Sequence, residues 1–291
     1  MKYSALIGNP VEHSVSPLLF QYLASKKGIE YAHIKIKIDE KKDLSKKIDN
    51  LFNLGFCGIN ITCPYKKDIF EIVDEFKNGS EKIHSINVIT KENNKICGYN
   101  TDGVAAIKAI EEERKITKDT KAIIFGAGGA AYAIFYELLK KTKKIVIVNE
   151  HLSVANTMVK DMNANCKTYS LDDLEGYQDY LLNSDLVINA TSVGMHPNDD
   201  KTIIDPKLIK KVNKNALFFD AIFNPWETKF IKAAKNSNHL IVSGGYMLIY
   251  QAILALSIWA NINVKLNDKE LNDLVKLMRK EIKRINGWVC M

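Results

Sequence analysis

A short glycine-rich segment between an apolar run and a helical stretch constrains the fold of this chain more than any other feature. Residues 121–131 have the sequence KAIIFGAGGAA, and the apolar run at 122–125 predicts a buried parallel strand. The glycines can form a tight turn, and a small residue at Ala131 would let the next helix pack closely on the strand. A strand, a glycine turn and a helix in this order favour a dinucleotide site, with the phosphates at the helix N-terminus. The alternative is a turn of small residues in another kind of α/β protein.

The rest of the chain alternates between predicted strands and predicted helices. Strands are expected at residues 3–8, 31–38, 58–62, 85–90, 95–99, 144–149, 185–189, 216–220 and 240–242. Helices are expected at 17–27, 41–54, from about 103 to 114, 132–141, 153–162 and 268–285, together with a long apolar helix around Gln251. Because the alternation occurs on both sides of residue 102, the chain is expected to fold as two α/β units.

The composition argues against several classes of function. A chain of 291 residues, 46% hydrophobic and 26% charged, has the size of about two globular domains. Its net charge of +7 comes almost wholly from scattered lysines, since arginine occurs only at positions 114, 279 and 284. A nucleic-acid-binding surface is therefore not expected.

The cysteines and the apolar runs bear on the compartment. The five cysteines form no CxxC pair and no cluster with histidine at metal-ligand spacing, which predicts reduced thiols and no metal site. There is no signal-peptide layout, and the longest apolar run, at 246–260, is too short to span a membrane. We therefore expect a soluble, cytoplasmic protein without a membrane partner.

Two serine hydroxyls follow the first predicted strand, in the segment before Pro17. If this segment is extended, Ser14 and Ser16 point the same way and could bind one ligand. Ser16 directly precedes a proline and so also has the position of a helix N-cap, which gives its hydroxyl a structural alternative. Ser14 has no such alternative, and it is the more informative of the two.

Three further polar residues lie near the ends of predicted elements. Lys66 follows the strand at 58–62, at the end where open α/β sheets place ligands, although most single lysines are surface charges. The expected helix after Pro64 would begin close to it. Asn87 has apolar neighbours in a predicted strand, so its amide must find partners, either structural or on a ligand. Asp102 precedes a helix and could be its N-cap.

Six segments, in the family's order, resemble shikimate dehydrogenases. They are GNPVEHSVSP (8–17), GINITCPYK (58–66), NTD (100–102), GAGGAA (126–131), INATSVGM (188–195) and GGYMLIYQ (244–251). The family interconverts 3-dehydroshikimate and shikimate with a nicotinamide cofactor, so the resemblance implies a CH–OH oxidoreductase of aromatic amino acid (chorismate) biosynthesis. It also implies a substrate domain of residues 1–103 plus 245–291, and a Rossmann-type doubly wound parallel-sheet cofactor domain of residues 104–244.

Lys66 and Asp102 match the catalytic pair of the family. Moving a hydride to or from the carbon that bears the oxygen requires a proton to move on that oxygen. A free lysine holds its proton too tightly to be a good base at neutral pH, so the two residues are expected to share the proton as a coupled pair. We expect Lys66 to be the principal acid and base, with Asp102 orienting it and the substrate hydroxyl.

The resemblance also implies two sets of binding residues. The substrate carboxylate would be held by Ser14 and Ser16, and the ring hydroxyls by Thr62, Asn87 and Gln251. Neutral hydrogen-bonding groups suit a small polyhydroxylated acid, because directional hydrogen bonds reject analogues that lack a hydroxyl. The cofactor would be held at its pyrophosphate by Gly126, Ala127, Gly128, Gly129 and Ala130, and near its nicotinamide by Ala221 and Gly244. Asn149 and Glu150, at the end of the next strand, are the candidates for its adenosine ribose on local chemistry.

Two departures from the family pattern affect ligand choice. The family usually has Asn-Arg-Thr after the second Rossmann strand, where the arginine binds the 2′-phosphate of NADP. This chain has Glu150 about 20 residues past the glycine loop, where an acid typically binds the free 2′-hydroxyl of NAD. NADP is thus favoured by the resemblance and NAD by the local chemistry. Phe223 replaces the usual tyrosine near the substrate carboxylate, which removes a hydroxyl.

Alternative functions remain open at the level of sequence. A quinate or aminoshikimate dehydrogenase would share most of these motifs, although Ser16 favours shikimate because quinate-oriented relatives often carry threonine there. A catalytically silent regulator that binds nucleotide and metabolite is a second alternative, against which both Lys66 and Asp102 argue. A monomer and a homodimer are equally compatible with the sequence.

Overall fold

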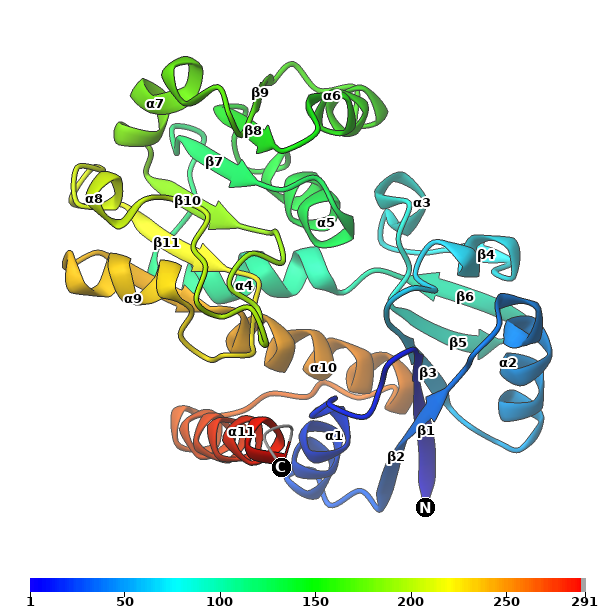
Figure 1. Cartoon of the computed structure of the whole chain (residues 1–291). Coiled ribbons are helices and arrows are strands. Elements are labelled where there is room, and N and C mark those ends of the chain that lie inside the picture. Colours follow the sequence, from blue (N-terminus) through cyan, green and yellow to red (C-terminus); the bar gives the residue numbers. More distant parts are fainter. Residues whose placement is uncertain (289–291) are drawn as a thin grey trace. The chain divides into compact units, whose positions relative to one another are not determined.

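The computed structural model describes residues 1–288, and within it the chain divides into two compact units (Figure 1). Unit 1 is formed by residues 1–101 and the chain from Ile249 onward, and unit 2 by residues 102–248. The boundaries expected from the sequence, 103/104 and 244/245, differ from these by two and four residues. The helix α10 (Gly244–Ala260) begins in unit 2 and continues in unit 1.

Unit 2 is built on a sheet of six parallel strands. They are β7 (Ala122–Phe125), β8 (Ile145–Asn149), β9 (Lys167–Ser170), β10 (Leu186–Asn189), β11 (Leu217–Asp220) and β12 (Leu240–Ser243), in the spatial order β12-β11-β10-β7-β8-β9. The strand order reverses between β7 and β10, which is the topology of a Rossmann fold. The prediction of a doubly wound parallel sheet is therefore confirmed, and ligands of such sheets bind at the carboxyl ends of the strands beside this reversal.

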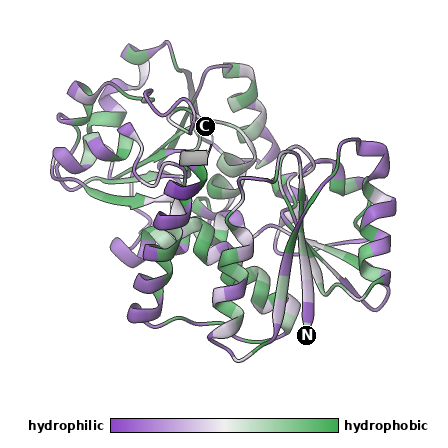
Figure 2. Ribbon diagram, turned by 60° about the horizontal axis from the view of Figure 1, so that its bottom comes forward, coloured by the Kyte–Doolittle hydropathy of each residue, from purple (hydrophilic) through white to green (hydrophobic). Residues whose placement is uncertain are grey.

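Helices connect these strands, and the core lies between them and the sheet. They are α4 (Asp102–Glu113), α5 (Gly129–Leu138), α6 (Leu152–Asp161), α7 (Leu174–Leu182), α8 (Pro206–Ile209) and α9 (Lys229–Asn236). All four residues of β7, β10 and β11 are buried, because helices cover both faces of a parallel sheet. Hydrophobic, green strand segments are accordingly visible in the ribbon (Figure 2).

Unit 1 contains a mixed sheet in the order β2-β1-β3-β5-β6-β4. Its strands are β1 (Lys2–Gly8), β2 (Tyr31–Lys37), β3 (Gly58–Ile61), β4 (Glu75–Phe76), β5 (Val88–Glu92) and β6 (Lys95–Tyr99). Strands β1, β2 and β3 are parallel, and β5 pairs antiparallel with both β3 and β6. The turn between β5 and β6 has Asn93 and Asn94 at φ 49° and 63°, as two-residue hairpins require.

The helices of unit 1 include three short helices of 4 to 10 residues and two longer C-terminal helices. They are α1 (Ser16–Ser25), α2 (Leu44–Asn53), α3 (Ser80–Ile83), the later part of α10, and α11 (Asp268–Trp288), with 3-10 turns η1 (Lys41–Asp43) and η2 (Asp68–Glu71). Two local predictions are wrong here. Strand β5 begins at Val88 rather than at residue 85, so Asn87 precedes the strand, and the segment after Pro64 is a turn that leads to η2 rather than a helix.

Among residues 1–288, no helix is both long enough and apolar enough to cross a membrane. The free cysteines in this range are Cys57, Cys63, Cys97 and Cys166. Cys290, the fifth cysteine of the sequence, lies outside the described residues.

Candidate active site

The loop between β1 and α1 brings two serine hydroxyls together. The Ser14 Oγ lies 2.9 Å from the Ser16 Oγ and accepts a hydrogen bond from the Ser16 backbone N–H at 3.2 Å. The two hydroxyls are therefore adjacent, as their spacing predicts. The segment is a turn rather than extended, because the Ser14 N–H donates to the Val11 carbonyl at 3.1 Å.

The prediction that Ser16 is the N-cap of α1 is wrong. Ser16 is the first residue of the helix and Val15 has the N-cap position, with no capping hydrogen bond from its own side chain. The hydroxyl that accepts from the first turn of the helix belongs to Ser14 instead. This leaves the Ser16 side chain at the helix N-terminus, where anions are favoured.

Lys66 lies in the turn that follows β3. The turn contains a cis Cys63–Pro64 bond, and the Tyr65 N–H donates to the Thr62 carbonyl at 3.0 Å. The Lys66 carbonyl accepts from the Ile86 N–H at 2.9 Å, which joins this turn to the segment before β5. Lys66 itself is half-buried. Thr62 and Lys66 thus lie together at the carboxyl end of β3.

A buried amide network surrounds Asn87, which is 3% exposed. Its Nδ2 donates to the Thr101 Oγ1 at 2.9 Å and to the Gln251 Oε1 at 3.5 Å, and its Oδ1 accepts from the Thr101 N–H at 2.8 Å. Gln251 lies on α10 and is also buried. The structure therefore brings together two predicted substrate residues that are 164 positions apart. Thr101 is the member of this network that sequence reasoning missed.

Asp102 is the first residue of α4 and is 7% exposed, so the alternative prediction that it precedes the helix as its N-cap is wrong. It directly follows Thr101, so the first residue of α4 is adjacent in sequence to the hydrogen-bond network of Asn87. Asp102 belongs to unit 2, whereas Lys66 belongs to unit 1.

The glycine turn after β7 has the backbone geometry that a bound phosphate needs. Gly126 has φ 111°, and a Cβ at this position would lie 2.9 Å from the Ala190 carbonyl oxygen of the loop after β10. A Cβ on Gly128 would meet no heavy atom within 4 Å, so this stretch of backbone is open to a ligand. Helix α5 starts at Gly129 with no side-chain cap at its N-terminus, and Ala131 is fully buried against the sheet. These residues fit a dinucleotide pyrophosphate.

The end of the neighbouring strand β8 carries Glu150 at the same edge of the sheet. The Gly126 N–H donates to the Val148 carbonyl at 2.8 Å, which ties the glycine turn to β8. Glu150 and His151 are exposed, and the Asn149 Nδ2 donates to the His151 carbonyl at 3.0 Å. An exposed carboxylate here could accept a hydrogen bond from a ribose hydroxyl.

The loop after β11 and the start of α10 approach each other very closely. A Cβ on Gly244 would overlap the carbonyl groups of Ala221 and Ile222, so only glycine permits this contact. Phe223 lies in the same loop, before a cis Asn224–Pro225 bond.

Asp220 organises that loop, and sequence reasoning missed it. Its carboxylate accepts from the Thr228 Oγ1 at 2.6 Å, the Ile222 N–H at 3.0 Å and the Asn189 Nδ2 at 3.1 Å. The side chain is fully buried, and this burial raises the pKa of Asp220 to about 7 despite these hydrogen bonds.

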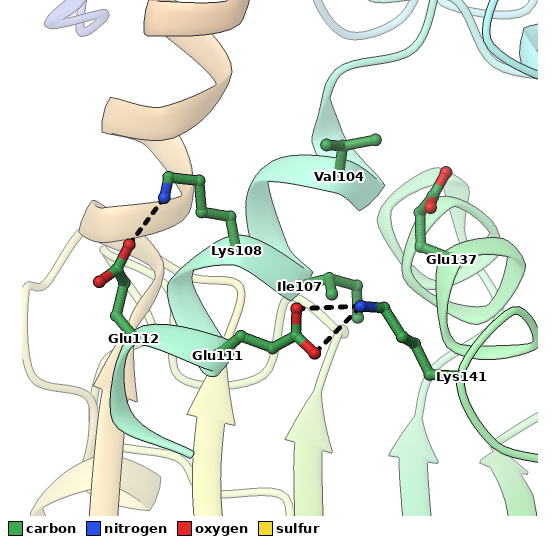
Figure 3. Close-up of a pocket in the computed structure, with 7 residues that line it drawn as sticks. All are labelled: Val104, Ile107, Lys108, Glu111, Glu112, Glu137 and Lys141. Carbon is green, nitrogen blue, oxygen red and sulfur yellow. Dashed lines mark hydrogen bonds and ion pairs between the residues drawn. The ribbon is translucent and has the colours of Figure 1, made fainter. Parts of the chain in front are cut away.

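A groove of about 420 Å³ lies elsewhere on unit 2, between α4 and α5 (Figure 3). Four of its five charged side chains are paired with one another: Lys141 contacts both carboxylate oxygens of Glu111 at 3.1 Å, and Lys108 contacts Glu112 at 2.7 Å. The fifth, Glu137, contacts Lys140 at 2.6 Å. No predicted site residue lines this groove. Among the described residues, no group of three or more His, Cys, Asp or Glu side chains could hold a metal ion.

Comparison with known proteins identifies the family. The model described as "Shikimate dehydrogenase substrate binding domain" matches residues 6–89, and that described as "Shikimate / quinate 5-dehydrogenase" matches residues 109–238. A shikimate dehydrogenase (NADP(+)) of Methanocaldococcus jannaschii is 36% identical over 271 residues, covering 90% of this chain and 92% of that protein. The chain belongs to the shikimate dehydrogenase family.

Two further relatives agree with this placement in the shikimate dehydrogenase family. A shikimate dehydrogenase (NADP(+)) of Clostridium beijerinckii is 34% identical over 285 residues and is covered over its whole length, together with 97% of this chain. A crystal structure of a shikimate dehydrogenase in complex with NADP+ has a TM-score of 0.84 and 34% identity, with 98% of this chain and 95% of that chain covered.

Proposed function

We propose that this protein is a shikimate dehydrogenase, which catalyses the reversible reduction of 3-dehydroshikimate to shikimate with a nicotinamide dinucleotide. The observation that carries the proposal is the buried network of Asn87, Thr101 and Gln251 in unit 1. Its neutral amide and hydroxyl groups lie next to the Lys66 turn and lead directly into Asp102. Such groups can recognise the hydroxyls of a polyhydroxylated acid.

The chemistry requires a hydride and a proton to move together. The nicotinamide, when bound, supplies or accepts the hydride at the ring carbon that bears the oxygen. In the direction of reduction, the Lys66 ammonium gives a proton to the oxygen of the substrate, and in oxidation the neutral Lys66 amine takes the proton of the hydroxyl. Asp102 orients the ammonium and the hydroxyl. Ser14 and Ser16 hold the carboxylate, and Thr62, Asn87 and Gln251 hold the ring hydroxyls.

The residues proposed to hold the cofactor are the glycine turn and the ends of the neighbouring strands. The pyrophosphate would lie against residues 126–130 at the N-terminus of α5, and Ala221 and Gly244 would flank the nicotinamide. Glu150 would accept a hydrogen bond from a free ribose 2′-hydroxyl, whereas it would repel a 2′-phosphate. We therefore propose that this chain uses NAD at least as well as NADP, in contrast to relatives named for NADP(+).

Replacing the proposed acid and base tests the assignment. We expect Lys66→Ala to lower kcat for shikimate oxidation by about 100-fold or more, as the loss of a general acid and base does, with a much smaller change in KM. Lys67→Ala is the matched control, because Lys67 is an exposed lysine of the same turn, and it should retain the kcat of the unsubstituted enzyme. Near-normal kcat in Lys66→Ala would refute the assignment.

Quinate is the second candidate substrate, because one of the matching family models covers quinate dehydrogenases as well. Ser16 favours shikimate over quinate, and measuring kcat/KM for both compounds under the same conditions distinguishes the two. A cytoplasmic location, expected from the cysteine pattern, is part of the same proposal.

A further inference from the structure

Lys35 lies beside the loop that carries the two serine hydroxyls. We propose that Lys35 is a positioning residue, which holds this loop in place and supplies the positive charge that favours the substrate carboxylate. The inference rests on the proposed function, which assigns Ser14 and Ser16 to that carboxylate. None of the segments that carry the family resemblance contains Lys35.

The topology of unit 1 places Lys35 at the edge of the sheet where the loop lies. Strand β2 runs parallel to β1, and Lys35 is in register with Leu6, two residues before β1 ends. Side chains two residues apart on a strand share a face, so Lys35 follows the buried His33 on the same face. It is the first exposed side chain on this face as β2 approaches the loop.

The ammonium of Lys35 contacts the backbone of the loop directly. Its Nζ donates to the Glu12 carbonyl at 2.6 Å and lies 3.4 Å from the Ser14 carbonyl. These carbonyls belong to the turn that the hydrogen bond between Ser14 and Val11 closes. Hydrogen bonds from a charged donor are stronger than neutral ones, so Lys35 fixes the backbone from which the Ser14 hydroxyl projects.

The charge of Lys35 is not neutralised by an ion pair within residues 1–288. The acidic side chain that feels its charge is Glu281 of α11, whereas the Glu12 carboxylate accepts the Val11 N–H at 3.0 Å. Glu281 is held by Arg284 at 2.6 Å, and the pKa of Glu281 is lowered by this hydrogen bond first and by the charge of Lys35 to a lesser degree. Lys37, by contrast, pairs with Asp39 at 2.8 Å.

A nearby positive charge would favour a carboxylate bound by Ser14 and Ser16. Hydroxyls are neutral, and the N-terminus of α1 contributes only a partial positive charge. The tyrosine hydroxyl that the family usually places near the carboxylate is missing in this chain, where Phe223 stands in its position. Lys35 therefore provides a full positive charge behind the serine loop.

Steady-state kinetics of the full-length enzyme with shikimate and with its methyl ester test this role. In Lys35→Met, we expect KM for shikimate to rise roughly fivefold, as for the loss of one partly exposed charge, while kcat and KM for the cofactor stay unchanged. Lys35→Arg should restore most of the affinity, since it keeps the charge and the donors. Lys37→Met is the matched control on the same strand and should keep the original KM.

The ester separates an effect of charge from a defect of packing. The methyl ester has no negative charge, so we expect Lys35→Met to leave its kcat/KM unchanged and the preference for acid over ester to shrink roughly fivefold. The inference is overturned if KM for shikimate does not change, or if acid and ester lose the same factor. If the unsubstituted protein oxidises neither compound with either cofactor, the proposed function is refuted, and this inference is refuted with it.

Discussion

His33 is a buried imidazole that gives this fold a defined sensitivity to acid. Its side chain is 6% exposed, and its Nδ1 lies 2.6 Å from the Ser4 Oγ, which also accepts from the Tyr31 hydroxyl at 2.7 Å. The ring stacks on Phe20 at a centroid distance of 4.2 Å. Within the described part of the chain, its Nε2 is buried and has no hydrogen-bond partner. A charged imidazolium would therefore be poorly solvated here.

The sign and size of the effect follow from the pKa. Burial lowers the pKa of His33 from 6.5 to about 3. The unfolded chain binds a proton at this side chain below about pH 6.5, whereas the folded protein does so only near pH 3, so acid favours the unfolded state. Between neutral pH and pH 5, His33 should lower the free energy of unfolding by about 2 kcal/mol.

Chemical denaturation at neutral pH and near pH 5 measures this contribution. Between these two conditions, we expect the free energy of unfolding to fall by about 2 kcal/mol less in His33→Phe than in the unsubstituted protein, whatever the absolute stability of the variant. His13→Gln removes an exposed imidazole and is the matched control, which should lose as much as the unsubstituted protein. The reasoning is wrong if His33→Phe and the unsubstituted protein lose the same free energy to within about 0.5 kcal/mol.

Two further predictions concern unit 2. Burial raises the pKa of Asp220 to about 7, so the contribution of this side chain to stability is present at acidic pH and is lost as the pH rises through 7. Between pH 6 and pH 8 the free energy of unfolding, measured with denaturant, should therefore fall by about 1 kcal/mol less in Asp220→Asn than in the unsubstituted protein. The same pH dependence in both proteins would contradict this. Glu150→Arg should shift the ratio of kcat/KM for NADP over NAD at least about tenfold towards NADP, or about 1.4 kcal/mol. A ratio that does not move would show that Glu150 does not face the ribose 2′-position.

The parts of the fold with strong local signals could be predicted from the sequence. The apolar strands and the glycine turn of unit 2 are short patterns whose meaning does not depend on distant residues. Other elements have weaker signals. Strand β9 has no buried residue, and its sequence has no apolar run from which a strand could be predicted. Helices α7 and α9 were missed although each has a visible N-cap, since Asp173 accepts from the Gly176 N–H at 3.2 Å and Thr228 from the Ile231 N–H at 3.3 Å.

The candidate site could be predicted only in part, because its geometry joins distant segments. The spacing of Ser14 and Ser16 predicts adjacent hydroxyls, but they meet through a turn and not through an extended strand. The contact between Asn87 and Gln251 joins a strand entrance to a helix far along the chain, and no periodicity encodes it. The contact of Lys35 with the serine loop depends on the register of β2 against β1, which is likewise a property of the folded sheet.

The most direct test of the central claim is the oxidation of shikimate by the unsubstituted protein, followed by the absorbance of the reduced cofactor with NAD and with NADP. We predict formation of 3-dehydroshikimate, with a higher kcat/KM for shikimate than for quinate and with NAD used at least as well as NADP. A protein that binds a dinucleotide but reduces neither cofactor with shikimate or quinate would contradict the account and would indicate a silent binding protein.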